Sequence, residues 1–187
     1  MSLTRCFIAL ELPLPVQKHL EGIIFRLMVA QADIKWVEPE NTHLTLKFLG
    51  EISPKELKSS RKVLLNQDGK RLSIQCRTGQ IGAFPSWSRP QVLWLGLQSG
   101  IREISTLQQS LENDLAEYGF ARGPKKFKPH ITLGRVRSLA NMDKLSEKIR
   151  NLSLEEIEFN FGEIALIKST LTQSGPVYQP LETIKLS

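Results

Sequence analysis

The same four-residue pattern occurs twice in the sequence, as His43-Leu44-Thr45-Leu46 and as His130-Ile131-Thr132-Leu133. The chain has three histidines in all, so the recurrence of this frame around two of them indicates a functional motif. In a β-strand, residues i and i+2 project from one face. Each histidine would therefore share a face with its threonine, while the leucines point into a core. Two imidazoles and two hydroxyls could then transfer protons and bind a phosphate.

Histidine suits this chemistry because its unperturbed pKa of about 6.5 allows it to act as acid or as base near neutral pH. No Asp, Glu or Cys stands at ligand spacing near either motif, so we expect neither a metal nor another cofactor. The third histidine, His19, falls in a predicted helix, and we expect it to be structural. A glycine-rich phosphate loop and a Ser-His-Asp signature are also missing from the sequence.

Apolar spacing and turn residues predict alternating strands and helices around the motifs. Helices are expected over residues 15–30, about 54–66, 101–118 and about 142–151. Strands are expected over residues 4–12, 42–49, 71–78, 80–84, 91–97 and 130–137, with three more in the tail, about 154–186. Ser53, Pro54 and Glu56 predict a capped start for the second helix.

The order of these elements suggests an internal duplication. Each motif strand follows a helix and a loop, and the two histidines lie 87 residues apart (130 − 43), which is close to half the chain. Loops of hairpin length between strands favour antiparallel sheets. We therefore predict an α+β fold over residues 1–187, a single domain of two pseudo-symmetric lobes with helices outside and an active-site groove between them.

The composition favours an RNA-binding protein of the cytoplasm. The net charge is +6, and the cysteines, Cys6 and Cys76, are too few for a disulfide framework, which suggests buried thiols in a reducing compartment. We expect no membrane span and no signal peptide. Basic residues concentrate around the two motifs, namely Lys47, Lys125, Lys126, Lys128, Arg135 and Arg137.

Both motifs and several other segments resemble one known family. Residues 43–50 (HLTLKFLG) and 129–135 (PHITLGR) are similar to the two signatures of the 2H phosphoesterases, in particular of the RNA 2′,3′-cyclic phosphodiesterase branch, also called 2′-5′ RNA ligase. Further segments of this branch are similar to residues 5–10, 92–97, 169–172 and 175–178. The resemblance spans nearly the whole chain.

The resemblance implies a metal-independent enzyme that hydrolyses the 2′,3′-cyclic phosphates of RNA or nucleotides to 2′-phosphomonoesters. The same site could join RNA ends through a 2′-5′ bond. The residues alone do not say which histidine is the acid, but the family implies His43 as proton donor and His130 as proton acceptor. Thr45 and Thr132 would then bind the phosphate. The expected partners are RNA ends with a cyclic phosphate, and we expect a monomer.

Further residues are candidates for the site. Arg135 could grip two phosphate oxygens, although regular strand alternation would point it away from His130, unless a bulge intervenes. The same alternation favours core packing of Phe48 over stacking on a base. Remaining candidates for contacts with the base or the RNA are Phe7, Arg5, Lys128 and Tyr178.

A second hypothesis remains open at this point. The chain could be a non-catalytic protein that binds RNA ends and uses its histidines only to recognise a phosphate. Assay of a cyclic-phosphate substrate in EDTA would separate an enzyme from such a binding module.

Overall fold

A computed structural model describes residues 2–69, 72–123, 127–173 and 175–186. Its elements are, in chain order, β1 (Thr4–Glu11), α1 (Leu14–Met28), β2 (Ile34–Trp36), the short 3₁₀-helix η1 (Pro39–Asn41), β3 (His43–Ile52), α2 (Pro54–Leu65), β4 (Ile74–Phe84), β5 (Val92–Ser99), α3 (Ile101–Ala116), β6 (Ile131–Val136), α4 (Met142–Arg150), β7 (Glu158–Phe161), β8 (Glu163–Leu171) and β9 (Pro176–Lys185).

The strands form two antiparallel sheets, one for each motif. The sheet of lobe A has the order β3-β1-β8-β9, and the sheet of lobe B has the order β2-β6-β5-β4-β7. The first motif begins strand β3, and the second leads into β6. The α+β fold with a motif on each antiparallel sheet, predicted from the element order, is confirmed.

Alternation along β1 shows how each sheet separates a core face from a site face. Cys6, Ile8 and Leu10 are buried in the main core together with apolar residues of the helices. Phe7 and Ala9 project from the opposite face, where they form a small separate cluster with two residues of β8 and with Tyr178 of β9. Two-sided burial of this kind is expected for a strand inside a sheet whose second face lines a site.

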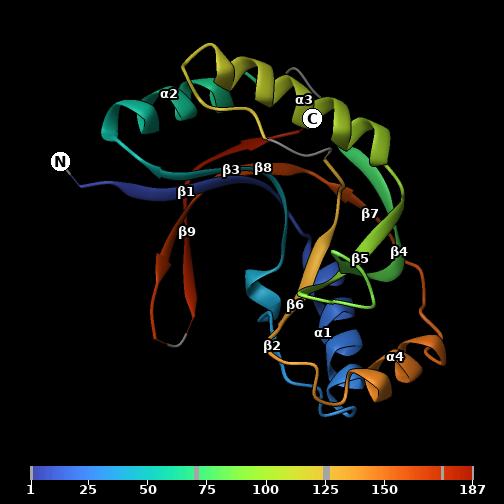
Figure 1. Cartoon of the computed structure of the whole chain (residues 1–187). Helices are drawn as coiled ribbons and strands as arrows, with labels where there is room; N and C mark the ends of the chain where they lie inside the picture. Colours follow the sequence, from blue (N-terminus) through green and yellow to red (C-terminus); the bar gives the residue numbers. More distant parts are fainter. Residues whose placement is uncertain (1, 70–71, 124–126, 174, 187) are drawn as a thin grey trace.

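The helices pack at the outside of the two sheets. Helices α2 and α3 lie side by side at one end of the molecule, and α1 and α4 lie together at the other (Figure 1). The predicted capping box is confirmed, because the Ser53 hydroxyl accepts from the Glu56 N–H while the Glu56 carboxylate accepts from the Ser53 N–H. Helix α3 buries apolar residues at helical spacing, as its sequence predicts, and they are Ile104, Leu107, Leu111 and Leu115.

Some predicted boundaries differ from the structure. The strands expected at residues 71–78 and 80–84 are one continuous strand, β4, because the break at Gly79 is a bulge against β5 rather than a turn. Lys125 and Lys126, which the sequence places in a basic loop, lie outside the described residues. Among the helices that are described, none combines the length and the apolar character needed to cross a membrane.

Candidate active site

Both motif histidines are held in the same way. The Nδ1–H of His43 donates to the carbonyl oxygen of Asn41 over 2.9 Å, and the Nδ1–H of His130 donates to the carbonyl oxygen of Lys128 over 2.8 Å. In each case the acceptor lies two residues before the histidine. Because a carbonyl oxygen can only accept, Nδ1 must carry the hydrogen. This leaves Nε2 of each ring as the atom that can take up or release a proton.

The predicted alternation within both motifs is confirmed. The motif leucines and Ile131 are fully or almost fully buried, whereas both threonines and both histidines are partly exposed. Thr45 pairs with Ala9 of β1, and Thr132 pairs with Trp94 of β5. Each lobe therefore presents a histidine and a threonine on one face of its sheet.

A β-bulge follows each motif at the same position. Pairing of β1 with β3 passes from Thr45 to Lys47 and skips Leu46, whereas pairing of β5 with β6 passes from Thr132 to Gly134 and skips Leu133. A bulge inserts one residue and so reverses the alternation beyond it. The residue five places after each histidine is thereby turned onto the site face. These equivalent residues are Phe48 in lobe A and Arg135 in lobe B.

The bulge corrects the prediction that Phe48 packs in the core. Its side chain is 66% exposed, and its ring lies 5.9 Å from that of Phe7 on the site face. Arg135 is likewise turned towards the site, although regular strand alternation would point its side chain away from His130. Burial lowers the pKa of His130 and raises that of Tyr178, and the positive charge of Arg135 acts to lower both.

Aromatic side chains surround His43. Phe7 stacks on its ring with the centroids 4.7 Å apart at 29°, and Tyr178 meets the ring edge-on at 5.3 Å. The pKa of His43 is lowered to about 4, mainly by burial; the hydrogen bond to Asn41 opposes this shift, and the charge of His130 contributes to it. His43 is therefore neutral at pH 7 in the free protein.

A second aromatic pair, which sequence reasoning missed, lies beside His130. The ring of Phe84 meets His130 edge-on at 4.9 Å, and Trp94 lies 6.3 Å from it. Burial lowers the pKa of His130, the charges of Lys128 and Arg135 add to this effect, and the hydrogen bond to the Lys128 carbonyl opposes it. Trp94 lies beside His130 because it pairs with Thr132 on the neighbouring strand. This register is set by the folded sheet, so the sequence alone did not reveal the aromatic pair.

Each lobe contributes half of the site, namely its histidine, its threonine and the residues around them. Several interactions connect these two half-sites. His43 and His130 are close enough for the charge of one to lower the pKa of the other. Burial raises the pKa of Tyr178 in lobe A, while the charges of Arg135 in lobe B and Arg5 in lobe A lower it. The two histidines thus act on each other electrostatically, Tyr178 contacts His43, and the charges of Arg135 and Arg5 act on Tyr178.

Lys47, one of the basic residues around the motifs, does not face the site. It is 7% exposed, and its ammonium donates to the Glu112 carboxylate of α3 over 2.7 Å and to the Ala121 carbonyl over 2.6 Å. The bulge at Leu46 explains this position, since both Leu46 and Lys47 are buried. Lys47 therefore links the first motif strand to α3 and to the segment that leads to the second motif.

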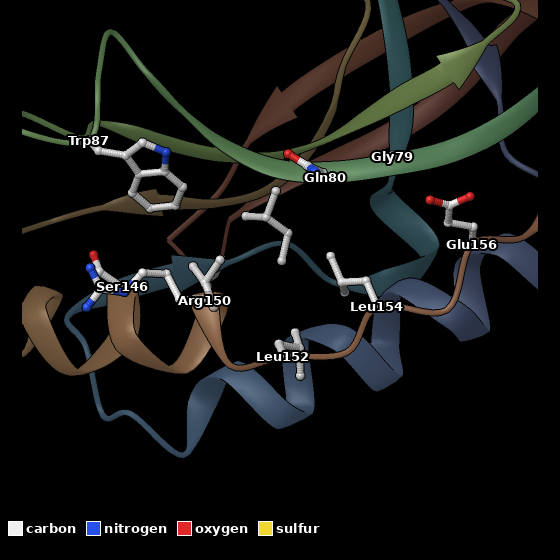
Figure 2. Close-up of a pocket in the computed structure, with 10 residues that line it drawn as sticks. Gly79, Gln80, Trp87, Ser146, Arg150, Leu152, Leu154 and Glu156 are labelled. Atoms are coloured by element: carbon white, nitrogen blue, oxygen red, sulfur yellow. The ribbon is translucent and has the colours of Figure 1, made fainter.

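A cavity of about 700 Å³ lies elsewhere, between β4, α4 and the segment after α4 (Figure 2). Its lining includes Gln80, Trp87, Arg150 and Leu154 but none of the predicted site residues. Within the described residues, no group of three His, Cys, Asp or Glu side chains is placed to hold a metal ion.

Comparison with known proteins places the chain in a family. Residues 13–173 match the family described as the 2′-5′ RNA ligase superfamily. A protein of Methanothermobacter thermautotrophicus named RNA 2′,3′-cyclic phosphodiesterase is 34% identical over 183 residues, which cover 97% of this chain and 98% of the relative. A protein of Thermotoga maritima with the same name is 34% identical over 95% of this chain and 92% of its own.

Solved structures show the same fold. E. coli LigT complexed with 3′-AMP superposes with a TM-score of 0.77 and 25% identity, covering 99% of both chains. A Thermus thermophilus structure reaches a TM-score of 0.79 at 27% identity, covering 97% of both chains. The fold and the duplicated His-x-Thr motifs define a 2H phosphoesterase. More narrowly, the chain belongs to the 2′-5′ RNA ligase superfamily.

Proposed function

We propose that the chain hydrolyses RNA and nucleotide 2′,3′-cyclic phosphates to 2′-phosphomonoesters without a metal ion. The observation that carries this proposal is the duplicated histidine geometry: each Nδ1–H is held by a carbonyl oxygen, so that each Nε2 is left for proton transfer. Relatives that match nearly the whole chain are named RNA 2′,3′-cyclic phosphodiesterases, which supports the choice of substrate.

The reaction needs one proton taken and one proton given. The Nε2 of neutral His130 takes a proton from a water molecule, whose oxygen attacks the phosphorus. The bond from phosphorus to O3′ breaks, and protonated His43 donates its Nε2 proton to O3′ as this oxygen leaves. The product carries a 2′-phosphate and a 3′-hydroxyl. General acid–base assistance of this type contributes roughly 10²–10⁴-fold for each group.

Charge that builds up on the non-bridging oxygens needs donors fixed in place. The hydroxyls of Thr45 and Thr132 share the faces of the two histidines and can donate to these oxygens. Arg135 adds a guanidinium that can bind two oxygens at once. On the lobe A side, the exposed ring of Phe48 is available to contact the base or the RNA, and so is Arg5, whose charge acts on Tyr178.

The same site can catalyse a related reaction with a different nucleophile. If a ribose 5′-hydroxyl replaces water, the same proton transfers join two RNA ends through a 2′-5′ phosphodiester. Microscopic reversibility then requires that the site also cleave such a bond to a cyclic phosphate and a 5′-hydroxyl. The description of the matching family as 2′-5′ RNA ligases supports this secondary activity.

Turnover of 2′,3′-cyclic AMP by chelator-treated protein tests the proposal. We expect the rate in EDTA to equal the untreated rate, with 2′-AMP as the product, because the proton transfers use only imidazoles. Loss of turnover in EDTA that is restored by a divalent cation would rule out metal independence. Binding of the nucleotide without any product would instead support a non-catalytic RNA-end-binding protein.

The pH dependence of kcat/KM is expected to be bell-shaped with its maximum on the acidic side of pH 6.5. Activity requires one histidine protonated and one neutral, and kcat/KM reports the pKa values of the free enzyme. Burial lowers the pKa of His43 to about 4 and also lowers that of His130 below its ordinary 6.5. The rate should therefore fall as the pH rises above both values, because the proton donor is lost.

The profile of kcat should lie at higher pH than that of kcat/KM, since the charge of a bound phosphate favours the imidazolium form. Steady-state rates for 2′,3′-cyclic AMP between pH 4 and pH 9 would show both profiles. A kcat/KM profile that is flat across this range, with the chemical step rate-limiting, would contradict two-histidine catalysis.

A further inference from the structure

The two half-sites share a scaffold but differ in what lies beside the histidine. Trp94 stands opposite Thr132 in lobe B, whereas the equivalent position opposite Thr45 in lobe A is Ala9. After the bulges, lobe B presents Arg135 where lobe A presents the exposed Phe48. Hence the surroundings of the phosphorus differ on its two sides, although the catalytic groups are repeated.

In lobe B, two aromatic rings hold a cation beside His130. The indole of Trp94 lies across Gly82 of β4, where the Cβ of any other residue would collide with its ring. The ammonium of Lys128 sits over this indole, 4.3 Å from the ring centroid, and 5.5 Å from that of Phe84. A cation held on an aromatic face in this way keeps its charge in a defined place.

Hydrolysis by water does not require this cation. Attacking and leaving oxygens lie roughly in line on opposite sides of the phosphorus. If His43 protonates the leaving O3′, the ribose of the cyclic phosphate lies on the lobe A side, and only a water molecule is needed beside His130. A nucleophile that is itself part of an RNA strand would instead bring its own phosphate to the lobe B side.

We propose that Phe84, Trp94 and Lys128 form the subsite for the acceptor strand, the RNA whose 5′-hydroxyl attacks the cyclic phosphate. Lys128 binds the first phosphate that follows the 5′-terminal nucleoside of this strand, and Trp94 positions the ammonium. This inference rests on the proposed function and on the assignment of His130 to the nucleophile. In ligation the 5′-hydroxyl proton passes to His130 and the P–O3′ bond breaks. In cleavage of the 2′-5′ bond, the same atoms move in reverse.

Cleavage of two 2′-5′-linked substrates tests the subsite. One is adenylyl-(2′→5′)-adenosine, and the other carries a 3′-phosphate on its second adenosine, so that they differ only in the phosphate which Lys128 would bind. We expect the wild-type kcat/KM to be about tenfold higher for the phosphorylated substrate at low salt and the ratio to fall as salt is added. Lys128→Met should bring the ratio close to one, Lys128→Arg should keep most of it, and Trp94→Leu should lower it.

Lys62 offers a matched control, since its ammonium lies over the ring of Tyr118 at 5.8 Å but it belongs to α2. Lys62→Met should keep the wild-type ratio. The inference is overturned if Lys128→Met retains the wild-type ratio, if wild type shows no preference, or if wild type hydrolyses 2′,3′-cyclic AMP yet cleaves neither 2′-5′ substrate. Failure to hydrolyse 2′,3′-cyclic AMP would instead refute the proposed function itself.

Discussion

Replacing either motif histidine should lower kcat/KM for 2′,3′-cyclic AMP by about 10²–10⁴-fold, because each supplies one of the two proton transfers. Glutamine is the suitable replacement, since it can preserve a hydrogen bond to the carbonyl of Asn41 or Lys128 while it cannot act as acid or base. The combined variant His43→Gln, His130→Gln should lose much less than the product of the two single losses, as groups that act together are not additive.

His19 on α1 provides the control for these substitutions, because it is the remaining histidine of the chain and lies outside both motifs. His19→Gln should retain wild-type kcat/KM. Circular dichroism and the unfolding midpoint of each variant would show that the fold is kept. A folded His43→Gln or His130→Gln protein with more than about a third of the wild-type rate would contradict acid–base catalysis by that histidine.

Lys47→Met should lower the free energy of unfolding by about 3–5 kcal/mol. The substitution leaves the Glu112 carboxylate buried without its ammonium partner, although the Gln108 amide still donates to it over 3.1 Å. It also removes the donor to the Ala121 carbonyl. Urea denaturation monitored by circular dichroism measures the change, provided that the slope of the transition is unaltered.

Two comparisons isolate the buried charge as the cause. The double variant Lys47→Met, Glu112→Leu should be more stable than Lys47→Met alone, since no uncompensated charge remains. Arg77 and Glu158 form an ion pair with both side chains about half exposed, where solvent screens the charges, so Arg77→Met should destabilise the protein much less than Lys47→Met. Equal destabilisation by Lys47→Met and Arg77→Met would contradict the account of Lys47 as a buried ion-pair partner.

The sequence was sufficient to predict the α+β fold and the shared face of each histidine and threonine. Both depend on local rules, namely the period of two along a strand and the apolar period of a helix. The capping box at Ser53 was predictable for the same reason, because its partners lie three residues apart.

What the sequence could not predict depends on pairing between distant segments. The bulges that turn Phe48 and Arg135 onto the site face arise from the registers of β3 with β1 and of β6 with β5. No local sequence pattern marks these bulges, and regular alternation wrongly predicted Phe48 on the core face of its strand. Lys47 is buried rather than available to RNA because Glu112, 65 residues further along the chain, folds against it.

The central claim is that the two imidazoles act on one phosphorus atom from opposite sides. A crystal structure with the product 2′-AMP bound tests it most directly. We predict that Nε2 of His43 lies within about 3.2 Å of the ribose O3′, while Nε2 of His130 lies equally close to a phosphate oxygen on the far side of the phosphorus. The claim is contradicted if either Nε2 is beyond the reach of a hydrogen bond or if both rings approach from the same side.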